Sequence, residues 1–338
     1  MFNKIIIYKN NLIQNIKQVK LQNPKSKICA MVKANAYGVG LKEVVSILEP
    51  YVDFWGVTCF FEASLVRNLT HNKILIVGPI EKGCVSSKFS YTCGSVEDVE
   101  YLAGLKKEIH IHIKINSGMN RYGFTNIKDI KRVLKIINKS SLKLEGMYTH
   151  FATTDSFVEK QMEMFSKIAH HKALKNHKFL LHADNSGVNE TKNHNLDMVR
   201  IGFNLYNKKD DWFSPVVEIK TQVVEIRSVK KGELVGYDYR YVATSNKKIG
   251  IIPIGYADGM DLKYIGFKLN INGKSCEILN ICMDCCMIDV TNVKIKKGDE
   301  LFVLNKFNTL ADYAKYSKTS EYEIMCKFSN MRAERIII

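Results

Sequence analysis

The sequence contains little proline and no long apolar segment, and each shortage excludes a class of protein. With 5 Pro and 20 Gly among 338 residues, it fits neither a fibrous nor a disordered chain. No apolar run approaches the roughly 18–20 residues that a membrane-spanning helix needs. Near the N-terminus, only Ile5, Ile6 and Ile7 form a continuous apolar stretch, which is too short for the core of a signal peptide. We therefore expect a globular, cytoplasmic protein with no membrane partner.

Acidic residues are also fewer than basic ones. The chain has 34 Asp+Glu against 50 Lys+Arg, a formal net charge of +16, which a nucleic-acid-binding protein could show. The excess is spread along the chain, however, without a long basic run and without alternation of aromatic and basic side chains. We therefore expect no nucleic-acid partner.

Cysteines at metal-binding spacing are scarce. Of the 9 cysteines, only Cys282 and Cys285 form a C-x-x-C, and no second C-x-x-C or H-x-x-x-H lies at zinc-finger spacing. Free cysteine behaves as a small apolar residue in protein cores. We expect reduced, structural cysteines and no metal site.

Over the first two thirds of the chain, short strand-like segments, apolar or alternating in polarity, alternate with longer segments of helical periodicity. Residues 41–49 place Val44, Val45 and Leu48 on one helical face, residues 157–174 show helical spacing, and Ser95 begins a capping box. Eight strands that alternate with helices are typical of a (β/α)8 TIM-type barrel, with a doubly wound open sheet as the alternative. The predicted strands are 28–33, 53–57, 73–77, 89–92, 109–115, 143–149, 178–182 and 197–201.

From about residue 215 the helical patterns end, and strand-like segments broken by Gly and Asn follow. Ile271-Asn272-Gly273 is a hairpin signal, because Asn-Gly suits the turn between two antiparallel strands. We predict an α/β protein with a barrel over residues 8–213 and a mostly β domain over residues 214–338. The N-terminal strand, residues 1–7, is expected to join the β domain.

Lys33 stands out because an apolar strand leads directly into it, within Val32-Lys33-Ala34-Asn35-Ala36-Tyr37-Gly38-Val39-Gly40. In a barrel, this position is at the C-terminal mouth, where catalytic residues gather. A partly desolvated lysine has a lowered pKa and can form Schiff bases. An isolated lysine at a strand end could equally well reach solvent.

This segment does not stand alone, because six more motifs follow it in order. Together the seven motifs resemble those of the alanine racemases, a family of fold-type III enzymes that depend on pyridoxal 5′-phosphate (PLP). The six are Gly118–Phe124 (GMNRYGF), Tyr148–Ala152 (YTHFA), His182–Ser186 (HADNS), Val199–Gly202 (VRIG), Pro253–Gly259 (PIGYADG) and Ile281–Asp284 (ICMD).

The resemblance implies a PLP-dependent isomerase that interconverts L-alanine and D-alanine and supplies D-alanine for peptidoglycan. It also implies a homodimer whose active sites take residues from both subunits. A racemase of the same fold with broader specificity, for serine or lysine, is the alternative.

The resemblance further implies a two-base mechanism. Racemisation removes the Cα proton from one face of the substrate and returns a proton to the other, so two bases on opposite faces suit the task. Lys33, which also binds the cofactor covalently, would act on the D-face, and Tyr237 of the partner subunit on the L-face. Both would need lowered pKa values, from burial or nearby positive charge.

Other site residues follow from the same motifs. Arg200 would contact the pyridine nitrogen of the cofactor, and because arginine keeps its proton, the ring would be a weaker electron sink. His150 and His182 would join Arg200 in a hydrogen-bonded chain that supplies positive charge. The cofactor phosphate would be held by Tyr37, Ser186 and the backbone amides of Gly202 and Phe203.

The substrate carboxylate would bind Arg121, with Met283 and Tyr256 of the partner subunit completing that site. Lys114 matches a lysine that some relatives carry as a carbamate, although a polar residue inside a barrel would also fit there. Three residues depart from the family pattern: Asn116 replaces a commoner acidic residue, Asn280 a basic one, and Met331 a tyrosine near the cofactor phosphate.

Overall fold

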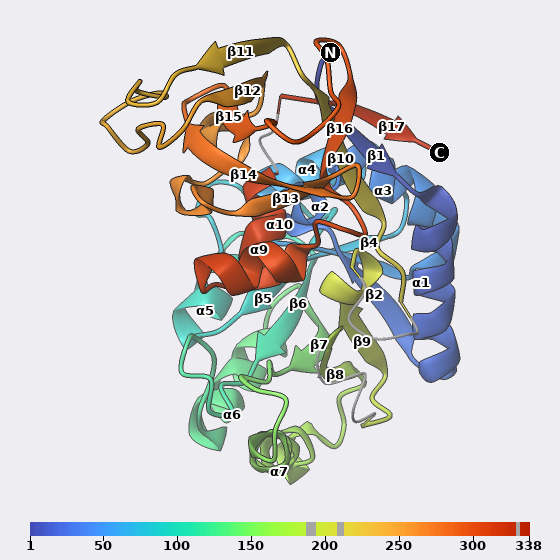
Figure 1. The fold of residues 1–338 in the computed structure, drawn as a ribbon. Helices are drawn as coiled ribbons and strands as arrows, with labels where there is room; N and C mark the ends of the chain where they lie inside the picture. Colours follow the sequence, from blue (N-terminus) through green and yellow to red (C-terminus); the bar gives the residue numbers. More distant parts are fainter. Residues whose placement is uncertain (187–193, 208–212, 329–331) are drawn as a thin grey trace. The chain divides into compact units, whose positions relative to one another are not determined.

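The computed structural model describes residues 1–186, 194–207, 213–328 and 332–338, and it divides into two compact units (Figure 1). The first, here the barrel unit, comprises Leu12–Ala36 and Leu41–Ser214. The second, here the sheet unit, comprises Met1–Asn11, Tyr37–Gly40 and Pro215–Ile338.

The barrel unit is built on a closed parallel barrel, which confirms the predicted fold. Its strands pair in chain order, and β2 also pairs with β9, so that the ring closes through pairs such as Cys29 with Arg200. The strands β2, β3 and β9 are largely apolar because side chains on both of their faces are buried. They are β2 (Lys27–Met31), β3 (Phe54–Val57), β4 (Lys73–Ile76), β5 (Ser90–Cys93), β6 (Ile109–Lys114), β7 (Leu142–Tyr148), β8 (Leu180–Asn185) and β9 (Met198–Ile201).

Two helices of this unit begin at a polar N-cap, one at Ser95 and the other at Asn126. Ser95 accepts a hydrogen bond from the amide of Asp98, whose carboxylate bonds back, so the predicted capping box is confirmed. In α6, Ile130, Val133 and Ile137 are buried at helical spacing. The helices are α1 (Lys9–Gln22), α3 (Leu41–Leu48), α4 (Phe60–Arg67), α5 (Val96–Gly104), α6 (Ile127–Ile137) and α7 (Phe157–Ala169), with the short segments α2 (Lys33–Tyr37), η1 (Glu49–Tyr51), η2 (Lys172–Leu174) and η3 (Phe203–Leu205).

The sheet unit contains two sheets, in the orders β16-β10-β1-β17 and β11-β12-β15-β14-β13. The N-terminal strand β1 lies between β10, to which it is antiparallel, and β17, to which it is parallel. Asn272 and Gly273 both have positive φ at the turn between β13 and β14, which confirms the predicted hairpin. The strands are β1 (Lys4–Ile7), β10 (Val217–Gln222), β11 (Glu225–Val229), β12 (Lys247–Ile252), β13 (Lys268–Ile271), β14 (Lys274–Ile281), β15 (Cys286–Asp289), β16 (Glu300–Leu304) and β17 (Glu334–Ile337).

The prediction that helices cease after residue 215 is wrong in detail. Two helices, α9 (Leu310–Ser317) and α10 (Glu321–Lys327), lie in the sheet unit, together with the single turns η4 (Tyr256–Asp258) and η5 (Leu262–Tyr264). Both helices have an N-cap signal in the sequence: Thr309 accepts from the amide of Asp312, and Ser320 accepts from that of Glu323. They are short, so their apolar periodicity is weak compared with the strands around them. Within the described ranges, we find no helix of the length and hydropathy that a bilayer crossing requires.

Candidate functional site

Lys33 lies one residue beyond Val32, whose amide continues the β2 ladder by bonding to the Gly56 carbonyl at 2.8 Å. Its place at the C-terminal end of a barrel strand is the one expected from the sequence. The backbone then turns left-handed, with φ of 52° at Ala34, 54° at Asn35 and 52° at Ala36. Such a conformation costs an L-residue roughly 1–2 kcal/mol, and strain of this kind is concentrated at functional sites.

Four basic side chains gather at the C-terminal mouth of the barrel. They are Lys33, Lys114, Arg121 and Arg200, and they act on one another electrostatically. Burial, followed by the charges of Arg121, Arg200 and Lys33, lowers the pKa of Lys114 to about 7. Since like charges in a partly buried cluster repel, this mouth is suited to an anionic ligand.

Lys114 points into the barrel and is only 3% exposed. Its ammonium nitrogen lies 3.4 Å from the ring centroid of Tyr122 and 5.8 Å from that of Tyr148. With a pKa near neutrality, a large share of the Lys114 side chains carry a neutral, nucleophilic amine at pH 7.

Arg200 is fixed on β9 by several acceptors. Its Nη1 lies 2.7 Å from Nδ1 of His182, and its Nη2 donates to the carbonyls of Thr149 at 2.8 Å and Ala183 at 3.1 Å. Nη2 is also 3.5 Å from Nδ1 of His150. The predicted association of Arg200 with the two histidines is therefore present in the structure.

Both histidines beside Arg200 are neutral at pH 7. Burial, and then the charges of Arg200, Arg121, Lys114 and Lys33, lower the pKa of His150 to about 3. Burial and the charge of Arg200 also hold the pKa of His182 well below its usual range. The positive field at this mouth thus comes from the lysines and arginines, and the imidazoles serve as hydrogen-bonding groups.

Ser186, Gly202 and Phe203, expected to hold a phosphate, lie together at the ends of β8 and β9. The Ser186 hydroxyl accepts from the Gly202 amide at 3.0 Å, and Phe203 follows directly in η3. A hydroxyl and successive backbone amides at strand ends form the type of concavity that binds phosphate.

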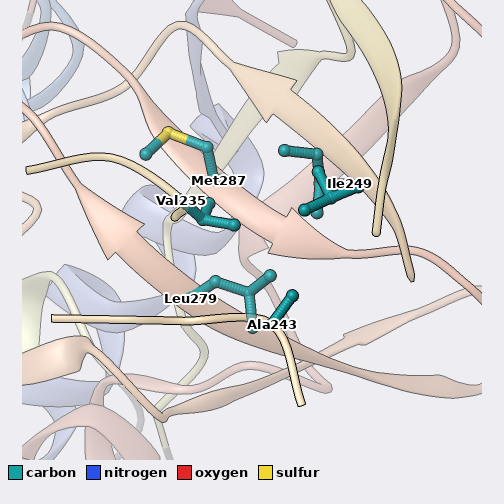
Figure 2. Packing of buried hydrophobic residues seen from close by; sticks show 6 residues of the cluster. Val235, Ala243, Ile249, Leu279 and Met287 are labelled. Atoms are coloured by element: carbon teal, nitrogen blue, oxygen red, sulfur yellow. The ribbon is translucent and has the colours of Figure 1, made fainter. Parts of the chain in front are cut away.

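Tyr237 belongs to the sheet unit, at the tip of a loop between β11 and β12. Two segments of this loop pair through Leu234 and Val242, and Tyr237 is 67% exposed. The loop is fastened to its sheet by a cluster of buried side chains, shown in Figure 2. The cluster consists of Val229, Val235, Ala243, Ile249, Leu279 and Met287.

Asn280, one of the departures from the family pattern, anchors this loop. Its fully buried amide donates to the carbonyls of Val235 at 2.8 Å and Tyr237 at 3.1 Å. Between them, Gly236 has φ of +74°, and a Cβ there would lie 2.6 Å from the Asn280 amide nitrogen. Asn280 thus sets the backbone position of Tyr237, a role that no sequence signal indicated.

Tyr256 and Met283 lie side by side in the sheet unit. The amide of Tyr256 donates to the Cys282 carbonyl, and that of Ala257 donates to the Met283 carbonyl, both at 3.0 Å. Tyr256 is 47% exposed and Met283 59% exposed. Side chains of this size and apolarity are available for contact with another molecule.

The two arginines near the C-terminus brace this part of the sheet unit. Arg332 makes a bidentate pair with Asp258, with both distances 2.8 Å. Arg335 donates to the Val39 carbonyl at 2.9 Å and so holds the end of the lysine motif. Tyr37, in the same motif, is buried, and its pKa is raised chiefly by burial, so its hydroxyl keeps its proton and can donate.

The other departures have separate outcomes. Asn116 shapes the loop before Arg121, because its Oδ1 accepts from the amides of Gly118 at 3.2 Å and Asn120 at 2.9 Å. Met331 lies outside the described residues. All nine cysteines are free thiols, and the described segments contain no group of three or more His, Cys, Asp or Glu side chains able to hold a metal.

Two further polar residues of the barrel, His112 and Glu145, were not predicted from the sequence as part of the site. His112 is fully buried and touches His182, and Glu145 lies within 3.2 Å of His112. For His112 the signal was the alternation His110-Ile111-His112-Ile113-Lys114, which places the three polar side chains on one face of β6. Glu145, on β7, had no such signal.

Comparisons with known proteins identify relatives along the chain. The family models described as "Alanine racemase, N-terminal domain" and "Alanine racemase, C-terminal domain" match residues 7–210 and 216–337. The alanine racemase of Borreliella burgdorferi strain ZS7 is 31% identical over 359 residues, covering 98% of this chain and 96% of that protein. A solved alanine racemase structure from Clostridium difficile 630 is 28% identical, has a TM-score of 0.92 and covers 100% of this chain and 96% of that one. The fold is also shared with a Bartonella henselae alanine racemase structure described with covalently bound pyridoxal phosphate (22% identity, TM-score 0.88, all of both chains).

Proposed function

The chain belongs to the alanine racemase family of PLP-dependent isomerases, and from that premise we propose that it interconverts L-alanine and D-alanine with PLP as its cofactor. Residues 8–213 form the cofactor-binding domain in this proposal. Residues 214–338, joined by strand 1–7, form the β domain.

The observation that carries the proposal is the positive cluster at the barrel mouth. Burial, and then the charges of the other cations in this cluster, lower the pKa values of Lys114 and His150. An anionic cofactor and a carboxylate substrate would relieve this repulsion, so the residues present fit PLP and an amino acid. When bound, PLP acidifies the Cα–H bond of the amino acid by accepting electron density from Cα.

Arg200 and Arg121 orient the two ligands in this scheme. Burial lowers the pKa of Arg200, but a guanidinium starts so high that it stays protonated and can only donate. At the ring nitrogen of the cofactor, Arg200 could not give up a proton, and so it would limit how strongly the ring withdraws electrons. Arg121 offers a planar fork to the substrate carboxylate. Tyr37, Ser186, Gly202 and Phe203 hold the phosphate.

Two bases carry the proton transfer. Lys33 would hold the cofactor covalently and would move the Cα proton on the D-face, and Tyr237 of a second subunit would move the proton on the L-face. Two groups on opposite faces allow the proton to leave one side and another to arrive on the other without a large motion of the substrate.

A homodimer follows from this assignment. Three side chains of the sheet unit are exposed: Tyr237, Tyr256 and Met283. Hydrogen bonds link their backbone segments, from the Asn280 side chain to the Tyr237 carbonyl and from the Tyr256 amide to the Cys282 carbonyl. These side chains can therefore enter the barrel mouth of another subunit as a group. There, Tyr256 and the Met283 backbone amide complete the carboxylate site around Arg121.

Lys114 is proposed to carry a carbamate. Its amine must lose a proton before it can attack CO2, and a pKa of about 7 provides that form at neutral pH. Attack of the neutral amine on CO2 forms the N–C bond and releases a second proton. The two losses together convert the ammonium cation into a carbamate anion, which can pair with the neighbouring Arg121.

The test is a racemisation assay of the PLP-loaded protein on L-alanine, L-serine and L-lysine. We expect turnover of L-alanine at a kcat/KM well above that of the other two, consistent with a role in supplying D-alanine for peptidoglycan. Preference for serine or lysine would replace the substrate assignment. A protein that neither turns yellow with PLP nor racemises any of the three would contradict the function itself.

A further inference from the structure

A chain of buried polar side chains crosses the interior of the barrel and ends at Arg200. From Arg200 the contacts run to Nδ1 of His182 at 2.7 Å, from His182 Nε2 to Nδ1 of His112 at 2.8 Å, and from His112 Nε2 to Glu145 at 3.2 Å. His112 and His182 are completely buried, and Arg200 is 4% exposed.

The far end of this chain is anchored at the N-terminal mouth of the barrel. Glu145 bonds to Lys73, to the Ser90 hydroxyl and, at 3.3 Å, to His110. It lines a cavity of about 860 Å³ formed by the residues that begin the barrel strands, at the end opposite to Lys33. Burial raises the pKa of Glu145, but its interactions with His112, Lys73 and Ser90 outweigh burial and hold that pKa below its usual range, so Glu145 is a carboxylate.

The two charged ends dictate which nitrogen of each imidazole carries the proton. Arg200 can only donate, so Nδ1 of His182 must be bare and its Nε2 protonated. His182 then donates to Nδ1 of His112, whose Nε2–H donates in turn to the Glu145 carboxylate. Both rings are neutral, since burial lowers the pKa of each. Every donor and acceptor along the line is satisfied in only this one arrangement.

The side chains packed around these hydrogen-bonded residues leave little room for the two imidazole rings to adopt another orientation. Tyr148 stacks on His182 with ring centroids 4.7 Å apart, and Phe54 meets His112 edge-on. Residue 146 is glycine, and a Cβ there would lie 2.2 Å from Nδ1 of His112. The strand beside His112 therefore accommodates the ring only because it lacks a side chain at that position.

We propose that Glu145 and His112 are positioning residues for Arg200: the carboxylate fixes the tautomer of His112, His112 fixes that of His182, and His182 thereby keeps a bare nitrogen that holds the guanidinium in place. Because the contacts of Arg200 matter only if it faces the cofactor ring, the consequence for PLP affinity rests on the proposed function. The tautomers themselves do not depend on it.

The experiment combines histidine NMR with PLP binding. Full-length protein labelled with 15N-histidine, with and without PLP, should show His112 and His182 in the Nε2–H tautomer alone. Glu145→Gln replaces an acceptor-only group by one that also donates, so both histidines should become mixtures of tautomers and PLP affinity should fall about tenfold. Glu145→Asp retains the carboxylate and should restore most of both. Glu108→Gln is the matched control, since Glu108 lines the same mouth and its side chain is 65% exposed.

The outcomes separate the two proposals. An Nδ1–H tautomer of either ring in the wild-type protein overturns the inference, and this measurement needs no variant to fold. So does a Glu145→Gln protein that keeps single tautomers and wild-type PLP affinity. If the wild-type protein does not bind PLP but shows the expected tautomers, the proposed function is wrong and the inference about the hydrogen-bonded histidines is still supported.

Discussion

At the scale of single residues, Tyr237 and its neighbour Tyr239 offer a direct comparison. Both are exposed tyrosines of the same loop, at 67% and 80%. If Tyr237 is the base on one face of the substrate, Tyr237→Phe should slow exchange of the Cα hydrogen of L-alanine with solvent deuterium by about 100-fold or more. Exchange from D-alanine should slow less, because Lys33 still serves that face. Proton NMR in D2O measures both rates.

Tyr239→Phe is the control for this experiment and should change neither rate. Equal slowing for L-alanine and D-alanine in the Tyr237 variant would show that the hydroxyl has no preference for one face. In that case it would have to act through cofactor or substrate binding, and the two-base assignment would need revision.

Lys114 gives a prediction with a definite dependence on pH. Its folded-state pKa of about 7 lies below the ordinary 10.5, so the unfolded chain binds more protons at this residue between those values. The contribution of Lys114 to the free energy of unfolding should therefore increase as the pH rises from about 7 towards 10.5. In 13C-bicarbonate, a carbamate carbon signal should grow from pH 6 to pH 8 as more amine becomes neutral, and Lys114→Met should lack it. A signal that is unaffected by Lys114→Met would place the carbamate elsewhere.

At the scale of secondary-structure elements, barrel strands such as β2 and β3 could be predicted because their burial on both faces leaves short, mostly apolar segments in the sequence. The hydrogen bonds of His112 and Glu145 could not be predicted, because they depend on the register of β6, β7 and β8. In that register His112 pairs with Gly146, and Tyr148 pairs with His182. Alternation shows which side chains share a face of one strand, but not which residue of the next strand they meet.

The left-handed backbone after Lys33 could not be predicted from the sequence pattern either, because alanine has no preference for positive φ. Ala34 is exposed and has φ of 52° and ψ of 51°. Ala34→Gly should raise the free energy of unfolding by about 0.5–1 kcal/mol, since relief of the strain exceeds the entropy cost of glycine. Urea unfolding of the apoprotein measures it. Ala103→Gly, in the right-handed helix α5, should instead lose up to about 1 kcal/mol. Destabilisation by both substitutions would contradict the left-handed geometry.

The loop that carries Tyr237 depends on Asn280. Asn280→Ala removes three side-chain hydrogen bonds: two donated to the carbonyls of Val235 and Tyr237, and one accepted from the Ile281 amide. Stability should therefore fall by about 2–3 kcal/mol. Racemisation of L-alanine should slow as well, because the tyrosine backbone loses its anchor. The control is Asn270→Ala. Asn270 is exposed and its Oδ1 accepts a hydrogen bond from the turn amide of Gly273, so losing it should cost less than 1 kcal/mol and leave the rate unchanged. A normal rate in the Asn280 variant would show that the loop does not need this anchor.

At the scale of the whole molecule, the +16 charge says less about partners than the position of four basic residues inside the barrel mouth. The barrel unit supplies the cations and the histidines, whereas Tyr237, Tyr256 and Met283 are exposed on the sheet unit. If the active site is shared between two copies of the chain, variants that each lack one base can restore a site together.

Lys33→Ala and Tyr237→Phe proteins should each be nearly inactive. In a mixed dimer, the subunit with Lys33 intact would receive Tyr237 from the Lys33→Ala subunit, so that one of the two sites contains both bases. After unfolding and refolding an equal mixture, half of the dimers should be mixed, and activity should recover to about a quarter of the wild-type value. Separately refolded samples combined without exchange are the control. If the co-refolded mixture forms dimers but remains as inactive as its components, both bases must come from the same chain.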